Sequence, residues 1–259
     1  MSGGENEIIL NSIREDLRES LPQNSLSPTE TIITPSIGKN SDCDPATTIH
    51  VDAFLYDEDA VDEMCDDGKM SRNYCVQCGS QNVKPLTFIT HSASVPQIKY
   101  IFQHLLPDLR EKTLVDVGSR TGAVLYGAYL FSNSEKITGV EIDRNFCQLQ
   151  QGIIEKYNMT DRIQIINNDI LNCAHLLQNA DVIILNNVFE FFMPRDTQER
   201  IWNYLYSTIK KTGSILVTVP SIEESLHNLQ TEVNLTKWVT TVDSSESMKL
   251  ANMVLYGSE

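Results

Sequence analysis

The sequence predicts an α/β fold with helices on both faces of a mostly parallel, doubly wound sheet. Between residues 113 and 219, five short runs rich in β-branched residues alternate with longer segments of helical periodicity. A glycine-containing turn follows the first run, and small polar or acidic residues follow the next three. Regular alternation of this kind is typical of parallel strands joined by helical crossovers.

The elements can be assigned in order from the periodicity of apolar residues. Before the first strand, Ser94 can cap a helix that has Pro96 in its first turn. After Pro220 the pattern loosens, and we expect two further strands, near 237–243 and 251–257. The five regular strands are predicted at 113–117, 137–141, 162–166, 181–185 and 214–219, with helices at about 121–132, 144–158, 170–178 and 195–210.

The first 48 residues differ in composition from the rest. Residues 5–21 place Ile9, Ile13 and Leu17 at helical spacing, which predicts an amphipathic helix. Residues 22–48 are rich in Ser, Thr, Pro and Asn without sustained periodicity, which is typical of a flexible linker. We therefore expect a flexible acidic segment over 1–48; the alternative is an arm whose helix docks on a partner.

Charge is concentrated at the front of the chain. The formal net charge is −15, and residues 1–70 hold 16 acidic and 4 basic residues against 19 and 16 in the remainder. A near-neutral domain with an acidic extension is not suited to gripping phosphate backbones, so we expect no non-specific binding of nucleic acid. This charge is compatible with binding to a basic protein or to a short feature in RNA.

The chain has the features of an intracellular protein. No apolar run reaches the ~18 residues of a membrane span, and the start of the chain lacks the basic and apolar regions of a secretory signal. We expect no membrane association and a cytoplasmic or nuclear location. The six cysteines are then thiols or metal ligands rather than disulfides: Cys43, Cys65, Cys75, Cys78, Cys147 and Cys173.

Cys75 and Cys78 form a Cys-x-x-Cys pair followed by glycine, the turn of a zinc knuckle. We assign it to a small region at 49–90, between the N-terminal segment and a main domain at 91–259. A structural zinc needs four ligands, and the sequence holds no second pair. A turn without metal and, less favoured, a redox pair are the alternatives. The residues that could complete a site are Cys43, His50, Cys65 and His91.

Polar residues lie at the carboxyl ends of four predicted strands. Ligands of open α/β sheets bind at this edge, and a carboxylate after the second strand is the arrangement that holds a nucleoside. Each residue could singly be a cap or a turn, as Asp169 could be for the short helix that follows it. Four sets in register predict a site: Asp116/Gly118, Glu141/Asp143, Asn168/Asp169 and Asn186/Asn187.

From about Val95 to the C-terminus, this order of features resembles the class I S-adenosylmethionine-dependent methyltransferases, which have a Rossmann-like sheet of seven strands. The family loop reads acid-x-Gly-x-Gly-x-Gly, and Asp116, Gly118 and Gly122 match it. The resemblance implies that Glu141 holds the ribose hydroxyls and that Asp169 meets the adenine. The cofactor-binding residues it implies are Asp116, Gly118, Ser119, Arg120, Gly122, Glu141, Ile142, Asp143, Asp169, Ile170 and Asn186.

The loop after the first strand departs from both families that it resembles. A nicotinamide dehydrogenase needs Gly-x-Gly-x-x-Gly, whereas this loop is spaced Gly-x-x-x-Gly, so that alternative is disfavoured. Arg120 stands where the methyltransferase loop has its middle glycine. Its side chain either points outward or meets the carboxylate of the cofactor's methionine end; a degenerate, weakly binding pocket is the third alternative.

The residues after the fourth strand indicate the acceptor. Asn186 and Asn187 can accept a hydrogen bond from an amine, and Phe189 can line its channel. We expect Phe192 to pack against the following helix. The order resembles the non-SET histone lysine methyltransferases of the disruptor-of-telomeric-silencing type and, loosely, the Asn-Pro-Pro-aromatic loop of other amino-group methyltransferases. The basic nucleosome-binding segment of those histone enzymes has no counterpart here.

The sequence thus predicts methyl transfer from S-adenosylmethionine to a nitrogen of a macromolecule, with protein lysine slightly favoured over RNA. Asn186, Asn187 and Phe189 are the predicted catalytic residues, and Cys75 and Cys78 are the candidate zinc ligands. The alternative is a catalytically inactive methyltransferase-like binding module. A metal-dependent small-molecule methyltransferase is disfavoured, because no cluster of acids and histidines follows the fourth strand. The oligomeric state stays open.

Overall fold

The computed structural model describes residues 3–36, 38, 40–76 and 83–249. Its centre is a parallel sheet of five strands, in the order β7-β6-β5-β8-β9. This confirms the predicted α/β fold with a mostly parallel sheet. The observed strands begin and end within one residue of the predicted ranges: β5 Thr113–Val117, β6 Lys136–Glu141, β7 Ile163–Asn167, β8 Val182–Asn186 and β9 Ile215–Val219.

Alternate residues of the strands pack on opposite faces of the sheet. Leu114 and Ile184 belong to a hydrophobic cluster that includes α4 and α5, whereas Val115 and Ile183 belong to a second cluster that includes α6 and α7. Both faces are therefore covered, as a doubly wound sheet requires. The helices of this domain are α3 Val95–Lys99, the π-helical turn η1 Tyr100–Leu105, α4 Ala123–Phe131, α5 Arg144–Lys156, the short η2 Ile170–Asn172, α6 Ala174–Asn179, α7 Arg195–Thr208, α8 Ile222–Leu226 and α9 Leu235–Trp238.

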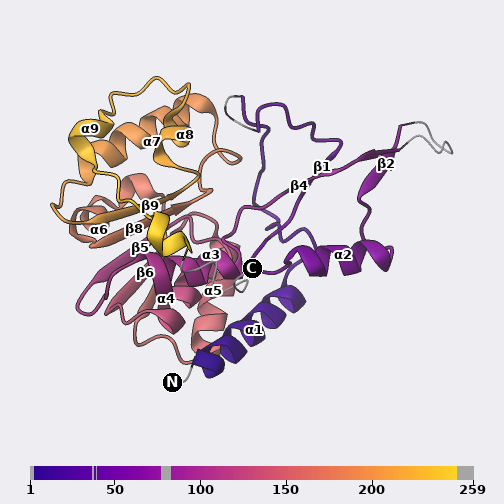
Figure 1. Cartoon of the computed structure of the whole chain (residues 1–259), viewed down its shortest axis with the longest axis horizontal. Coiled ribbons are helices and arrows are strands. Elements are labelled where there is room, and N and C mark those ends of the chain that lie inside the picture. Colours follow the sequence, from indigo (N-terminus) through magenta and orange to yellow (C-terminus); the bar gives the residue numbers. More distant parts are fainter. Residues whose placement is uncertain (1–2, 37, 39, 77–82, 250–259) are drawn as a thin grey trace.

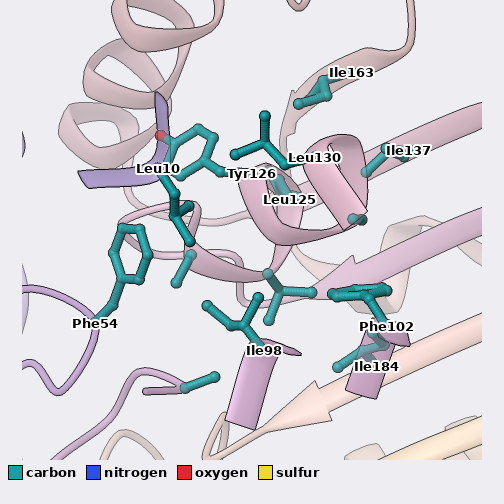
Figure 2. Close-up of a cluster of buried hydrophobic side chains, with 14 of the residues drawn as sticks. Leu10, Phe54, Ile98, Phe102, Leu125, Tyr126, Leu130, Ile137, Ile163 and Ile184 are labelled. Carbon is teal, nitrogen blue, oxygen red and sulfur yellow. The ribbon is translucent and has the colours of Figure 1, made fainter. Parts of the chain in front are cut away.

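The predicted N-terminal helix is present as α1 (Gly3–Ser20) and lies against α4 and α5 (Figure 1). Leu10, Ile13 and Leu17 are buried, one helical turn apart, and are part of the same core as the sheet. Figure 2 shows Leu10 between Phe54 and Tyr126 of α4. The helix is thus docked on the main domain by its apolar face.

The residues after α1 follow a packed course, which differs from the flexible linker expected over 22–48. Ser25 and Ser27 are buried, and the Ile33 amide donates to the Phe191 carbonyl at 2.8 Å. The physical reason is that polar side chains of this segment find partners on the sheet domain rather than water. The division of the chain at residues 48 and 90 stays a prediction.

Short elements connect the N-terminal segment to the sheet domain. β1 (Thr48–His50) pairs in parallel with β4 (Thr87–Ile89), and α2 (Glu58–Asp66) follows β1. β2 (Asn73–Cys75) and β3 (Val83–Pro85) pair antiparallel and project away from the sheet domain in Figure 1. Within the described ranges, no helix combines the length and the apolar character that crossing a bilayer requires.

The prediction of a strand at 237–243 was wrong. Residues 235–238 form α9, and Trp238 donates its indole N–H to the Ile209 carbonyl at 3.0 Å and stacks edge-on against Tyr206. Trp238 thus fixes this helical turn on the end of α7, and among the described residues no strand pairs with this stretch. The strand predicted at 251–257 lies outside the described residues.

Replacement of Leu10 by alanine tests the docking of α1. Because the side chain is 1% exposed within the main core, Leu10→Ala should lower the free energy of unfolding by about 2 to 5 kcal/mol. Urea titration followed by circular dichroism measures it. Ile8→Ala in the same helix is the matched control, because Ile8 is 68% exposed and should cost less than about 0.5 kcal/mol. Equal effects of the two substitutions would contradict the docking.

Candidate functional site

The predicted strand ends meet at one cavity. It has a volume of about 590 Å³ and lies at the carboxyl edge of β5, β6, β7 and β8. All four strand ends contribute lining residues, as expected for a parallel sheet. Among the lining residues are Gly118, Arg120, Glu141, Ile142, Asp143, Asn168, Asp169, Ile170, Asn186, Asn187 and Phe189.

Three of the residues predicted to bind the cofactor lie behind the residues that line the cavity. Asp116, Ser119 and Gly122 do not line the cavity. Asp116 is fully enclosed, and burial, together with the nearby charge of Glu141, raises its pKa well above the ordinary value. Gly122 has φ +86° and lies against the Tyr126 ring, so a side chain would clash there. These residues therefore shape the loop between β5 and α4 and do not face the cavity.

Glu141 stands at the tip of β6 and closes the turn beside it. It is buried, its Oε2 accepts from the Arg120 amide at 2.8 Å, and its Oε1 accepts from the Asp143 amide at 2.8 Å. Burial raises the pKa of Glu141, although both amide hydrogen bonds oppose that shift. Each carboxylate oxygen keeps a further lone pair, so Glu141 can still accept from hydroxyl groups of a ligand.

Asp143 caps α5 and is shared with the N-terminal segment. Its Oδ1 accepts from the amides of Asn145 and Phe146, and its Oδ2 accepts from the hydroxyl groups of Ser27 and Thr29. The carboxylate therefore holds residues 27–29 against the mouth of the cavity. Thr29 and the two residues that follow it line the cavity directly.

Apolar side chains form a slot beside the acids. Ile142 lines the cavity although its side chain is 62% exposed, and Ile170 and Phe146 line it from buried positions. Asp169 lies next to this slot and caps η2 through the Leu171 amide at 2.9 Å. An exposed isoleucine beside a carboxylate is a surface that a flat, partly polar ring can cover.

Arg120 neither points outward nor is left available for a ligand carboxylate. Its guanidinium is buried and donates to Glu30 at 2.8 Å, to Asp52 at 2.8 Å and to the Ser25 carbonyl at 2.8 Å. Its Cζ also lies 5.0 Å from the centre of the Phe146 ring. The residue has φ +45°. Arg120 thus connects the glycine loop to two segments that precede the sheet.

The N-terminal contribution to the site was missed from the sequence. Ser27, Thr29 and Glu30 come from a stretch with no periodicity or motif. Their partners, Asp143 and Arg120, lie about 90 to 116 residues further along the chain. The one local signal is the arginine in a loop that otherwise favours glycine, since a buried arginine needs an acid from elsewhere.

At the acceptor end, the structure brings Asn186 and Asn187 to the cavity wall. Asn186 is buried, its Nδ2 donates to the His91 carbonyl at 3.4 Å, and its Oδ1 has no partner among the described residues. Asn187 has φ +49°, and its amide donates to the Val219 carbonyl at 2.7 Å. A buried oxygen without a partner at a cavity wall is suited to receive a donor from a ligand.

Both phenylalanines line the cavity, although only Phe189 was expected to do so. Phe189 lines the cavity but is 5% exposed, and its ring packs edge-on against Trp202 of α7 at 5.8 Å. Phe192, expected to pack on the following helix, lines the cavity and contacts the His91 ring at 4.9 Å. Both rings therefore border the cavity, and Phe192 is the less buried of the two.

A pair of histidines, of which His91 is buried, lies beside these aromatic rings. His50 Nδ1 and His91 Nε2 are 2.8 Å apart, and Phe191 packs edge-on against both rings. Burial, with the positive charge of Arg120, lowers the pKa of His91 to about 3. Both imidazoles are therefore neutral near pH 7, and His91 is a polar wall of the cavity rather than a charged one.

The zinc prediction is not supported. Within the described ranges, no group of three or more His, Cys, Asp or Glu side chains is arranged to hold a metal. Cys75 is exposed at the end of β2, whereas Cys78 lies outside the described residues. His50 and His91, two candidate partners, are occupied with each other.

No protein-family model and no curated protein matches the chain. Among solved structures, the C-terminal domain of precorrin-6Y C5,15-methyltransferase from Rhodobacter capsulatus aligns with a TM-score of 0.38 and 17% identity, over 49% of this chain and 62% of that one. An RNA methyltransferase from Salinibacter ruber, in complex with S-adenosyl-L-homocysteine, aligns with a TM-score of 0.35 and 14% identity, over 47% and 70%.

A third structure, TrmK from M. capricolum in complex with S-adenosyl-homocysteine, aligns with a TM-score of 0.30 and 13% identity. The alignment covers 34% of this chain and 38% of that one. The chain therefore spans less than two thirds of the length of two of these three structures. Likenesses at these TM-scores do not define a function.

Replacement of Arg120 by methionine tests the buried ion pairs. Glu30 and Asp52 would be left without their cation, and the loss of one partner of a buried pair costs about 3 to 5 kcal/mol of unfolding free energy. Arg195→Met is the matched control, because its pair with Glu199 lies at the surface, with the Arg195 side chain 40% exposed, and should cost less than about 1 kcal/mol. Chemical denaturation measures both. An Arg120 variant as stable as the Arg195 variant would refute the assignment.

Proposed function

We propose that the protein is a methyltransferase that uses S-adenosylmethionine and methylates a nitrogen of a macromolecule. The observation that carries the proposal is the convergence of four strand ends on one 590 Å³ cavity, with the acid Glu141 at the tip of β6. A cavity of this volume is in the range that holds a nucleoside-sized ligand. The position of the acid after the second strand of the series supports the same ligand.

The residues at the cavity fit S-adenosylmethionine. Glu141 would accept hydrogen bonds from the ribose hydroxyl groups, because its oxygens keep free lone pairs. Ile142 and Ile170 would cover the two sides of the adenine, with Asp169 near its edge. The positively charged end of the cofactor would be favoured by the excess of carboxylates in the lining, where Glu30, Glu141, Asp143 and Asp169 face Arg120 and Arg144.

S-adenosylmethionine supplies an electrophilic methyl group: the acceptor nitrogen's lone pair forms the new N–C bond, the C–S bond breaks, and the nitrogen releases a proton to water. Transfer of this kind depends on alignment and exclusion of water, not on a covalent enzyme intermediate. Asn186 Oδ1 would accept from the acceptor N–H and so aim its lone pair, with Asn187 beside it. Phe189 and Phe192 would wall the channel.

Protein lysine is slightly favoured over RNA as the acceptor. The net charge of −15 disfavours a polyanion. The Asn-Asn-x-Phe order of residues 186–189, which resembles the Asn-Asn and phenylalanine segment of the non-SET histone lysine methyltransferases, also supports lysine. A catalytically inactive module that binds partners through the same fold is the alternative, and binding of S-adenosylmethionine separates the two.

Label transfer tests the reaction. A cell extract incubated with the protein and isotopically labelled S-adenosylmethionine should acquire label in protein, read by mass spectrometry. Asn186→Ala should lower the labelling by about tenfold to a hundredfold, because one charge-assisted hydrogen bond contributes about 1.5 to 3 kcal/mol. Asn172→Ala, at an exposed asparagine of η2 that does not line the cavity, is the control. Label confined to metabolites, or none above a boiled sample, would refute the proposal.

Glu141→Gln tests the cofactor site by itself. The substitution keeps the size of the side chain but removes its charge and replaces one of the two oxygens that accept from backbone amides by an NH2 group, so the Kd for S-adenosylmethionine should rise by about tenfold to a hundredfold. Isothermal titration calorimetry measures it. Glu155→Gln, at an exposed position of α5, should leave the Kd unchanged. The assignment of Glu141 fails if both variants bind as the unmodified chain does.

A further inference from the structure

A second cavity adjoins the first on the side away from Glu141. Its volume is about 890 Å³, and it lies between the carboxyl ends of β8 and β9, α7, α8 and the loop that contains Gly38 and Asn40. Three consecutive residues, Asn187, Val188 and Phe189, line both cavities. The wall between the two cavities is therefore the same short segment that follows the buried Asn186.

The lining of this second cavity carries negative charge. Glu190, Glu223 and Glu224 line it, and no lysine or arginine does so among the residues that the structure describes. Lys39 lies outside those residues. Glu190 is half-buried, and its Oε2 has one side-chain partner, the Asn40 amide at 3.3 Å. Burial and the charge of Glu224 raise the pKa of Glu190, although the hydrogen bonds from Asn40 oppose that shift.

Aromatic rings form the inner part of the same cavity. Trp202 is 2% exposed and packs edge-on against Phe189, and both line the cavity. A ring face attracts a cation, and an indole does so most strongly. Both rings are almost fully buried, at 2% and 5% exposed, so they give this cavity an apolar wall and not an open ring face. Asn186, whose Oδ1 has no partner among the described residues, lines the neighbouring cavity and directly precedes the shared wall. The outer end offers the exposed carboxylates of Glu223 and Glu224.

We propose that this second cavity receives the methyl acceptor, and that it takes the cationic side chain of a lysine in a basic segment of protein. This rests on the proposed function, because the cavity meets the cofactor cavity only at the shared wall of residues 187–189. The carboxylates attract the ammonium group and neighbouring basic residues of the segment. The two rings give the aliphatic part of the side chain an apolar wall, and the nitrogen reaches Asn186 past residues 187–189, which border both cavities. Nucleic acid is disfavoured, because its phosphates would face three glutamates.

Peptide binding tests the inference on the full chain without S-adenosylmethionine. A fluorescein-labelled peptide of lysine and alanine residues should bind, as followed by fluorescence anisotropy, and the same peptide with norleucine for lysine should not. The triple variant Glu190→Gln, Glu223→Gln, Glu224→Gln should raise the Kd at least about tenfold. Glutamine is close to isosteric, and at position 224 it also preserves the capping box of α8.

The control variant removes the same charge elsewhere: Glu111→Gln, Glu135→Gln and Glu155→Gln replace exposed residues that line neither cavity. It should bind the peptide as the unmodified chain does. Lys39→Ala should bind at least as tightly, because it removes a positive charge from the loop that holds Gly38 and Asn40. Thermal unfolding confirms that each variant is folded. If the triple variant does not fold, the single variant Glu223→Gln, at an exposed side chain, replaces it in the binding experiment.

The inference is overturned if the control variant loses as much affinity as the cavity variant, if the lysine and norleucine peptides bind alike, or if a single-stranded RNA binds more tightly than the lysine peptide. Because no cofactor is present, these results are independent of methyl transfer. Binding of S-adenosylmethionine with no selective peptide binding would leave the proposed function intact and remove this inference alone. The reverse result would leave a lysine-binding cavity on a protein that is not a methyltransferase.

Discussion

The buried guanidinium of Arg120 is the interaction on which the rest of the site depends. A charge in the interior is tolerated only when nearby groups satisfy its donors and balance its charge. Glu30 and Asp52 supply the balance, and the Ser25 carbonyl accepts a further hydrogen bond. The cluster joins three parts of the chain: the segment after α1, the turn after β1, and the loop between β5 and α4.

Both acids of the cluster are themselves held in place. Asp52 accepts from the amides of Phe54 and Leu55 and from the Ser92 hydroxyl, so the turn after β1 keeps its carboxylate fixed toward Arg120. Phe54 and Leu55 are buried in the core beneath α1. The apolar docking of α1 and the polar cluster therefore support each other, since each positions the chain for the other.

The Arg120 cluster also fixes the cavity in which we propose that the cofactor binds. The Arg120 amide donates to Glu141, and the Arg120 side chain pairs with Glu30. Arg120 therefore positions both the acid at the tip of β6 and the segment that covers it. The Thr29 hydroxyl group donates to Asp143 and so holds the same segment against the cavity at a second point. The N-terminal segment is part of the cavity wall, and the acidity at the front of the chain lies in part at the site itself.

The sheet and the convergence of its strand ends were predictable from the sequence, because apolar runs and parallel connections are local signals. Glu141, Asp143, Asp169 and Asn186 follow from that geometry. The partners of Arg120 were not predictable, since contacts across about 90 residues leave no periodic trace.

Local packing decided the remaining differences. Phe189 and Phe192 both line the cavity, and the pattern after β8 indicated only the first, because the course of the chain beyond Asn187, with its positive φ, leaves no local signal. A similar reason explains why residues 235–238 form a helical turn where a strand was expected near 237–243: Trp238 hydrogen-bonds to the Ile209 carbonyl and packs edge-on against Tyr206 of α7.

Hydrogen–deuterium exchange on the full chain, with and without S-adenosylmethionine, tests the central claim most directly. The account predicts that the cofactor slows exchange at residues 118–122, 141–146 and 168–171, and equally at residues 27–33, which line or approach the same cavity. Protection at the strand ends without protection at 27–33 would contradict the role of the N-terminal segment. No protection at any of these residues would contradict the cofactor site itself.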